Sequence, residues 1–475
     1  MSAKKAPIKR SKTISPWRKV AEAPPEYRRR GEQLTLFRRS LNGNENGQAA
    51  FRDPAFGENK NLPVHRWVPW IAGYSASFVD DVIAAYLSGR KRAVVLDPFS
   101  GVGTTLLQAV LRGHDAVGFE INPYPALAAK AKLSSLALDL AEFGSSVNEM
   151  EGTAQHWKKV PPPIEAPLPF RSRIPFFSPR VQQQVLHAIY FINRIRKSQI
   201  ADLFRTAFGA VMVSFSNYSY EPSLGSRPAA GKPLIDDADV AQILATKLRQ
   251  MQTDMLWLRN EVGKRKLGDW KVVNADFFGA NGQLTSNTVD LMVTSPPYMN
   301  NYHYVRNTRP QLYWLNYIAS PSEQRHLETN NFGQYWQTVR GVRPLELNFD
   351  HVLLSKTLKA LRETRSEDGA YGGPGWANYV TSYFNDCYRF MEALKRLLVH
   401  GGTGVIVIGN SIIQGMNIQT EQLLGEIGKL SGLELEGVHC IREKRVGASI
   451  TRSSVRYGRE NKATLSESAV VLRKR

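Results

Sequence analysis

Residues 294–298 combine side chains and backbone groups that could hold a planar amine. Thr-Ser-Pro-Pro-Tyr stands there, directly after an apolar run at 289–293 that predicts a buried strand. Each proline fixes φ near about −65° and lacks a backbone N–H, so a rigid turn is expected. The carbonyls of Ser295 and Pro296 would be free to accept hydrogen bonds, and Tyr298 would present a flat ring beside them. The pattern favours a site for an amino group on a planar ring, with a plain strand-ending turn as the alternative.

A glycine-rich turn forms a second candidate site. It follows a β-branched run at 94–96 and precedes small and apolar residues at 104–111 that predict a helix. Gly101 and Gly103 would let the backbone approach a ligand closely, because neither has a Cβ. The next predicted strand ends at Glu120, where a carboxylate could accept hydrogen bonds from ribose hydroxyls. This order of elements favours a mononucleotide-type cofactor at the strand-to-helix turn.

Together these motifs resemble those of the amino-methylating DNA methyltransferases, which use S-adenosylmethionine. Residues 97–105, Asp-Pro-Phe-Ser-Gly-Val-Gly-Thr-Thr, are similar to the family's cofactor motif, and residues 295–298 to its catalytic motif. Residues 62–75 resemble the motif that precedes the first strand and covers the methionine end of the cofactor. Residues 274–278 are similar to the end of the third strand, where Asp276 would face the adenine amino group.

The resemblance implies a set of site residues. The implied cofactor contacts are Asp97, Pro98, Phe99, Gly101, Gly103, Thr104, Glu120, Asn122, Asp276 and Phe277. The implied catalytic residues are Ser295, Pro296, Pro297 and Tyr298. Structural roles stay open for four of these: helix capping for Asp97 and Asn122, and core packing for Phe99 and Tyr298.

The chemistry expected of this family depends on positioning more than on a base. An exocyclic amine is a poor nucleophile, so acceptors at Ser295 and Pro296 would orient it and draw electron density onto nitrogen. Tyr298 would stack on a base flipped out of the duplex. In the family, Ser/Thr-Pro-Pro-Tyr leans toward cytosine N4, and Asp/Asn-Pro-Pro-Tyr leans toward adenine N6.

The sequence therefore predicts a site-specific DNA methyltransferase that acts on cytosine N4. Adenine N6 is the close alternative. An RNA guanine-N2 methyltransferase is less favoured, because no RNA-binding module is recognisable. A non-catalytic DNA-binding subunit is disfavoured by the intact Gly101, Gly103, Ser295 and Tyr298.

Composition narrows the class of protein. The formal net charge is +20, which is typical of proteins that meet phosphates; a merely basic surface is the alternative. Cys387 and Cys440 have no metal-ligand spacing, and the nine histidines form no cluster, so no metal is expected. No apolar run approaches about 18 residues, and no signal sequence opens the chain. A cytoplasmic, nucleoid-associated bacterial protein is expected.

Periodicity along the chain predicts an α/β fold with a doubly wound, mainly parallel, Rossmann-like sheet of six or seven strands. Residues 1–60 are expected to form a basic, disordered arm, and 61–134 the cofactor-binding part. Residues 135–270 predict a helical insertion and 306–380 a second, irregular insertion, both candidates for DNA recognition. Residues 271–305 and 381–475 would form the catalytic part, and the basic segment 442–475 would suit phosphate contacts.

Two partners besides double-stranded DNA are indicated. Gln33-Leu34-Thr35-Leu36-Phe37 resembles the short peptide by which bacterial proteins dock on the DNA-polymerase sliding clamp. In an extended arm, Leu36 and Phe37 could fill an apolar pocket; packing on the catalytic domain is the alternative. A restriction–modification role would add a cognate restriction endonuclease.

Overall fold

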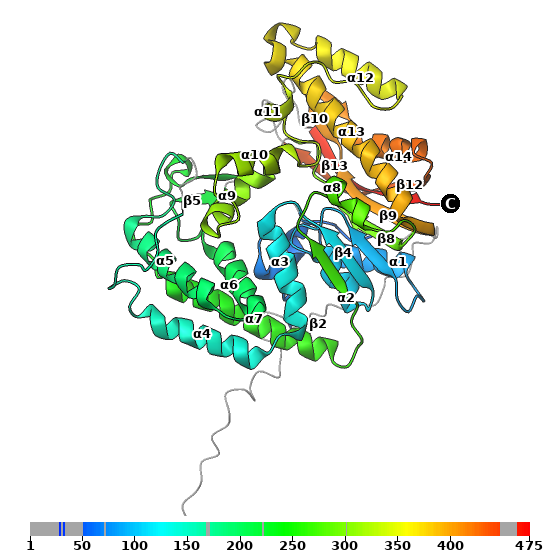
Figure 1. Cartoon of the computed structure of the whole chain (residues 1–475). Helices are drawn as coiled ribbons and strands as arrows, with labels where there is room; N and C mark the ends of the chain where they lie inside the picture. Colours follow the sequence, from blue (N-terminus) through cyan, green and yellow to red (C-terminus); the bar gives the residue numbers. More distant parts are fainter. Residues whose placement is uncertain are drawn as a thin grey trace, which may run out of the picture.

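A seven-stranded sheet organises the protein (Figure 1). The computed structural model describes residues 51–70, 73–167, 172–220, 223–300, 302–446 and 463–475, and the backbone of 28–29 and 32–33. The strand order is β12 (Glu434–Val446), β13 (Ala463–Arg473), β9 (Leu398–Gly409), β8 (Val289–Thr294), β3 (Val94–Asp97), β4 (Asp115–Phe119) and β7 (Trp270–Val273). β13 runs antiparallel to β9 and β12, and the other pairings are parallel. The predicted mainly parallel α/β sheet is confirmed.

Helices cover both faces of this sheet, which is why its central strands are apolar without interruption. Side chains alternate between two cores, because successive residues of a strand point to opposite faces. The first core contains Val95, Leu291, Val293, Val405 and Val407. The second contains Leu96, Met292, Ile406 and Ile408. The first is covered by α1 (Ala76–Tyr86), α2 (Thr104–Leu111) and α3 (Pro123–Ser134), and the second by α13 (Gly373–Leu397) and α14 (Thr420–Leu430).

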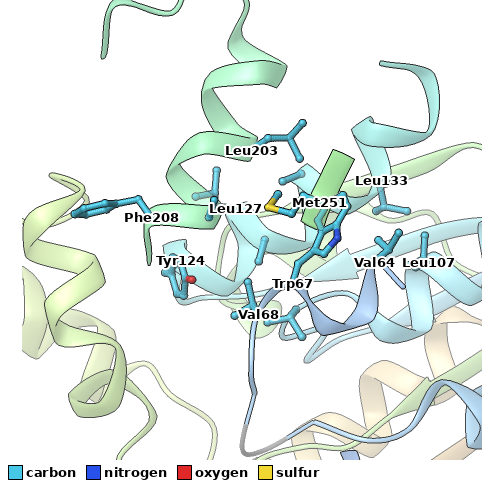
Figure 2. Close-up of a cluster of buried hydrophobic side chains, with 14 of the residues drawn as sticks. Val64, Trp67, Val68, Leu107, Tyr124, Leu127, Leu133, Leu203, Phe208 and Met251 are labelled. Carbon is cyan, nitrogen blue, oxygen red and sulfur yellow. The ribbon is translucent and has the colours of Figure 1, made fainter. Parts of the chain in front are cut away.

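The segment predicted as a helical insertion is helical. It contains α4 (Leu140–Ala154), α5 (Pro179–Arg194), α6 (Ser198–Val211) and α7 (Val240–Val262), and a hairpin of β5 (Tyr218–Tyr220) and β6 (Leu224–Ser226). Its core is continuous with the first core of the sheet. Figure 2 shows Trp67 among Leu127 of α3, Leu203 of α6 and Met251 of α7. The indole of Trp67 donates a 3.0 Å hydrogen bond to the buried Asp254 of α7, so the insertion is joined firmly to the catalytic sheet.

The second insertion, expected to be irregular, is instead helical. It contains α9 (Tyr304–Trp314), α10 (Pro321–Thr329), α11 (Trp336–Val339) and α12 (Val352–Glu363). α13 begins at Gly373, so its first residues also belong to this segment. α9 lacks the apolar periodicity that predicts a helix, because polar residues occupy part of its buried face. Asn307 and Gln311 are buried there and form hydrogen bonds. None of the helices that the structure describes is long and apolar enough to cross a membrane.

Residues 51–60, which were expected to belong to the basic arm, instead pack on the sheet domain. The guanidinium of Arg52 binds Asp81 of α1 at 2.7 Å, and the amide of the fully buried Asn59 donates to the carbonyl of Tyr74 at 3.0 Å. Arg52 and Asn59 therefore have partners within the folded domain, whereas the polar composition of this segment had predicted a solvent-exposed chain. Of the clamp-like segment, Gln33 belongs to β2 (Glu32–Gln33), which pairs with β1 (Arg28–Arg29); Leu34, Thr35, Leu36 and Phe37 lie outside the described residues.

Candidate active site

The ends of β3 and β8 lie where the strand order reverses, and open α/β sheets bind ligands at such a point. Asp97 ends β3 and Thr294 ends β8. The carboxylate of Asp97 accepts hydrogen bonds from the hydroxyls of Thr294 (2.6 Å) and Tyr74 (2.9 Å). Burial raises the pKa of Asp97, and these hydrogen bonds oppose the rise. The buried side chain of Asp97 therefore links the end of β3 to the end of β8 through its hydrogen bond with Thr294.

The glycine-rich turn follows Asp97 and leads into α2. Gly101 and Gly103 have φ values of 49° and 80°, which L side chains rarely adopt. A Cβ on Gly103 would also approach the Cβ of Ala129 to 2.8 Å, so this glycine lets α2 pack on α3. The N–H of Gly101 donates to Glu120 at 3.0 Å. Gly101 thus faces the ligand side of the turn, whereas Gly103 faces the core.

A narrow cavity of about 70 Å³, the cofactor slot, lies at the ends of β3, β4 and β7. Its lining includes seven of the ten predicted cofactor residues: Pro98, Phe99, Gly101, Glu120, Asn122, Asp276 and Phe277. The predicted catalytic residues Ser295 and Pro297 also line it. The other three predicted cofactor residues, Asp97, Gly103 and Thr104, are buried beneath it and do not line it.

Glu120 supplies the carboxylate of the slot. Its Oε2 accepts from the N–H of Gly101 at 3.0 Å, and its Oε1 accepts from the N–H of Asn122 at 2.8 Å. Burial raises the pKa of Glu120 to about 7, against the effect of these hydrogen bonds. A carboxylate with this pKa is half protonated near neutral pH, so any ligand that donates hydrogen bonds to it will favour the ionised form. Asn122 itself caps α3 by accepting from the N–H of Tyr124.

Aromatic rings form the other side of the slot. The centroid of Phe99 lies 5.1 Å from that of Phe332 and 6.2 Å from that of Phe277. Asp276 caps α8 (Phe277–Ala280) with its carboxylate, which accepts from Gly279 at 2.8 Å. Phe332 belongs to the second insertion, and no local pattern pointed to it. The slot therefore offers aromatic faces together with the carboxylates of Glu120 and Asp276, which suits an adenine ring and a ribose.

A larger cavity of about 790 Å³ lies on the other side of the Ser-Pro-Pro-Tyr turn. It is within the range of about 300–1,000 Å³ that is usual for ligand pockets. Its lining includes Ser295, Pro296 and Tyr298 from the turn, and the further tyrosines Tyr74, Tyr124, Tyr218, Tyr220, Tyr302 and Tyr304. Aromatic faces of this kind suit stacking with a planar ligand.

The turn itself is held rigidly and keeps acceptors available. The carbonyl of Pro297 accepts a 2.9 Å hydrogen bond from the hydroxyl of Tyr383. Among the described residues, none donates a hydrogen bond to the carbonyls of Ser295 and Pro296. Burial raises the pKa of Tyr298, and a hydrogen bond with the Ser295 side chain opposes the rise. Ser295, Pro296 and Tyr298 therefore line the large cavity, and two carbonyls of the turn remain available as acceptors.

Three residues line both cavities: Trp70, Ser295 and Tyr304. They form the wall between the slot and the large cavity. Trp70 lies in the segment 62–75 that resembled a cofactor motif, but its indole had no distinguishing local signal. Tyr304 follows the turn by six residues, and only its place at the start of α9 brings it to the wall.

Both insertions meet at the large cavity. The side chain of Asn307 on α9 accepts from the N–H of Leu224 at 2.9 Å, and its backbone carbonyl accepts from the hydroxyl of Tyr220 at 2.8 Å. The neighbouring Thr308 accepts from the side chain of Asn122 at 2.7 Å. These contacts connect β5, β6 and α9 to the end of β4. The two insertions therefore form one wall of the cavity together.

Comparison with known proteins finds a similarity to a methyltransferase along most of the chain. The chain is 22% identical to the Type II methyltransferase M.BsoBI of Geobacillus stearothermophilus over 442 residues, which covers 84% of each chain. No family model matches the chain. Two structures of the rRNA methyltransferase aviRa from Streptomyces viridochromogenes match 87% of this chain and 85% of theirs, at 10% and 11% identity and TM-scores of 0.28 and 0.25. TM-scores this low carry no argument about the substrate.

Proposed function

We propose that this protein is an S-adenosylmethionine-dependent DNA methyltransferase that methylates the exocyclic N4 of cytosine. The observation that carries the proposal is the shared wall: the turn at Ser295 separates a slot suited to a nucleoside from a tyrosine-lined cavity suited to a base. Similarity to a Type II methyltransferase over 84% of both chains supports methyl transfer as the reaction.

The residues of the slot fit this cofactor in their chemistry. Glu120 would accept hydrogen bonds from the ribose hydroxyls, and Asp276 would accept from the adenine amino group. Phe99, Phe277 and Phe332 would contact the adenine ring. When bound, S-adenosylmethionine supplies an electrophilic methyl group. The slot of about 70 Å³ is smaller than a nucleoside needs, so binding requires a side chain of its wall to move.

The large cavity would receive the base. A base inside the duplex keeps its amine out of reach, so the target nucleotide must flip out. Tyr298 would stack on the ring, and the carbonyls of Ser295 and Pro296 would accept the two N–H bonds of the amine. This would orient the nitrogen lone pair toward the wall, on the other side of which the slot would hold the methyl donor. The proton that the amine loses would pass to water, directly or by relay through the hydroxyl of Ser295.

DNA as the methyl acceptor is supported by charge as well as by the site. The chain carries a formal charge of +20, and phosphate neutralisation by Lys and Arg supplies much of non-specific DNA affinity. The α9 helix and the β5–β6 hairpin line the cavity from two insertions. We therefore assign base recognition to these two elements acting together. Serine at the first position of the turn favours cytosine N4 over adenine N6.

Mass spectrometry of nucleosides tests the assignment. Duplex DNA is incubated with the protein and S-adenosylmethionine, then digested. The expected product is 4-methylcytosine, and the Tyr298→Ala variant, prepared in the same way, should give almost none. 6-Methyladenine would move the assignment to adenine N6. Methylated guanine in RNA substrates, with no product in DNA, would overturn the choice of nucleic acid. No methylated nucleoside in either would overturn the function.

A further inference from the structure

We propose that Trp70 is the gate of the cofactor slot: its indole closes the slot in the free protein and must leave its seat before an adenosine-type cofactor can bind. The inference rests on the proposed function, because it concerns the same slot. It gives a role to a residue of the segment 62–75 that was not among the predicted site residues.

Two glycines form the seat of the Trp70 indole. A Cβ on Gly101 would lie 3.2 Å from Nε1 of Trp70, and a Cβ on Gly73 would lie 3.2 Å from its Cδ1. Both distances are tighter than ordinary van der Waals contact. Gly73 does not have a positive φ, so its backbone conformation does not require glycine. Glycine is instead favoured there because a Cβ would collide with the rings of Trp70 and Phe56. The indole edge therefore lies directly over the ligand side of the glycine-rich turn, where a cofactor must approach.

The volumes of the two cavities indicate why the Trp70 indole would have to move before a cofactor binds. The slot measures about 70 Å³, well below the roughly 300 Å³ at which small-molecule pockets begin. The large cavity beside it measures about 790 Å³ and can receive an indole. Trp70 lines both spaces. Rotation of this one side chain would enlarge the slot and leave room for a base in the large cavity.

Trp70 is also the part of the wall best able to move. Ser295 lies in the proline-rich turn and hydrogen-bonds Tyr298, and the hydroxyl of Tyr304 bonds the backbone of Tyr298. Among the described residues, none accepts a hydrogen bond from the indole of Trp70. Trp67 provides the contrast, because it is fully buried and anchored on Asp254 at 3.0 Å. The segment is thus anchored by a hydrogen bond at Trp67, whereas the partly buried side chain of Trp70 is held by packing alone.

A closed gate lowers affinity in proportion to the open fraction. If the open form is populated about one-tenth of the time, the apparent Kd is about tenfold higher than that of a permanently open slot. Removal of the gate should therefore tighten cofactor binding. If Trp70 instead only supported the fold, or contacted the bound cofactor, its removal would weaken cofactor binding.

Calorimetric titration of the full-length protein with S-adenosylhomocysteine tests the gate. Trp70→Ala should tighten binding about tenfold, and Trp70→Phe should tighten it less. Trp67→Phe is the matched control, three residues away in the same segment, and should give no tightening. Stopped-flow binding should show a concentration-independent opening step in the wild type that is faster or absent in Trp70→Ala.

Each outcome decides the matter. Unchanged or weaker binding by both Trp70 variants, with thermal midpoints near that of the wild type, would overturn the gate and leave the methyltransferase assignment standing. If Trp70→Ala does not fold, Trp70→Phe decides by the same criterion. Equal tightening in Trp67→Phe would mean a general loosening of the segment and would also overturn the gate. No binding to any of the proteins, wild type included, would overturn the proposed function and the gate with it.

Discussion

The hydroxyl of Thr294 donates a 2.6 Å hydrogen bond to Oδ1 of Asp97, across 197 positions of sequence. Both side chains are essentially inaccessible to solvent. The bond connects the last residue of β8, which leads into the Ser-Pro-Pro-Tyr turn, with the last residue of β3, which leads into the glycine-rich turn. The bond therefore connects the two turns, which in the proposed function would hold the base and the cofactor.

Thr294→Val should test that connection. The variant removes the donor and leaves a buried carboxylate oxygen with one partner fewer, so the free energy of unfolding should fall by about 1–3 kcal/mol. Urea unfolding measures the change. Thr294→Ser keeps the hydroxyl and should recover most of the loss. Equal stability of the Val variant and the wild type would show that the contact is dispensable.

Tyr298→Ala should remove most turnover and leave cofactor affinity within about twofold. Stacking on an extruded base is worth roughly 1–3 kcal/mol, and loss of alignment adds to that. Methyl transfer to DNA and calorimetry with S-adenosylhomocysteine separate the two effects. Tyr298→Phe keeps the ring and should retain most activity. Full activity of the Ala variant would exclude the stacking role.

Cofactor affinity should depend on pH through Glu120. The pKa of this carboxyl is about 7 in the free protein, and ribose hydroxyls would donate to its ionised form. Binding then releases a proton below that pKa, so affinity should fall up to about tenfold per pH unit below pH 7 and level off above it. Calorimetry across this range measures the slope. Glu120→Gln should bind more weakly with no such slope, and a slope that persists in it would assign the titration elsewhere.

Lys132 should make stability depend on pH. Its side chain is fully buried, its nearest acceptor is the carbonyl of His65 at 3.5 Å, and burial lowers its pKa from 10.5 to about 7. Between these two pKa values the unfolded chain binds a proton that the folded chain does not, so stability should rise with pH from about 7 to about 10.5.

Lys132→Met should therefore be more stable than the wild type at pH 7 by several kcal/mol, and its stability should lack that rise. Urea unfolding at about pH 7 and pH 9 measures both effects. Lys130→Met, on the exposed side of the same helix α3, is the matched control and should change little. A Lys132→Met variant that is less stable at pH 7 would show that the ammonium is favourably held.

DNA affinity should fall steeply with salt. Each phosphate neutralised contributes about −0.9 to the slope of log K against log salt on duplex DNA. Residues 1–40 carry twelve Lys and Arg, so their deletion should flatten this slope without changing which base is methylated. Fluorescence anisotropy with a labelled duplex at several salt concentrations measures the slope. A slope unchanged by the deletion would exclude phosphate contacts by this segment.

Local sequence determined the strands, turns and helices whose formation depends on the conformational preferences of a few neighbouring residues. The strand predicted from the apolar run at 289–293 is β8, which ends one residue later at Thr294, and the β-branched run at 94–96 lies within β3. Proline and glycine restrict or release φ at single positions, so the turns after these strands could also be predicted. The helical insertion followed from apolar residues at helical spacing.

Other features needed the tertiary structure. The helix α9 could not be recognised because its buried amides find their partners on distant segments, as Gln311 does at the carbonyl of Gly209. Arg52 and Asn59 are paired inside the fold for the same reason.

The candidate site likewise has features that local sequence predicts and features that depend on the tertiary structure. The sequence by itself determined which residue types stand at the carboxyl ends of β3, β4 and β8, because strand ends and turns are local. Only the tertiary structure decided that Asp97 lies beneath the slot, that Phe332 closes it from more than 200 residues away, and that Trp70 and Tyr304 form its wall with Ser295. Strand order and the packing of the insertions set those distances. Both depend on contacts between side chains that are far apart in sequence, and these contacts leave no period or motif in any single segment.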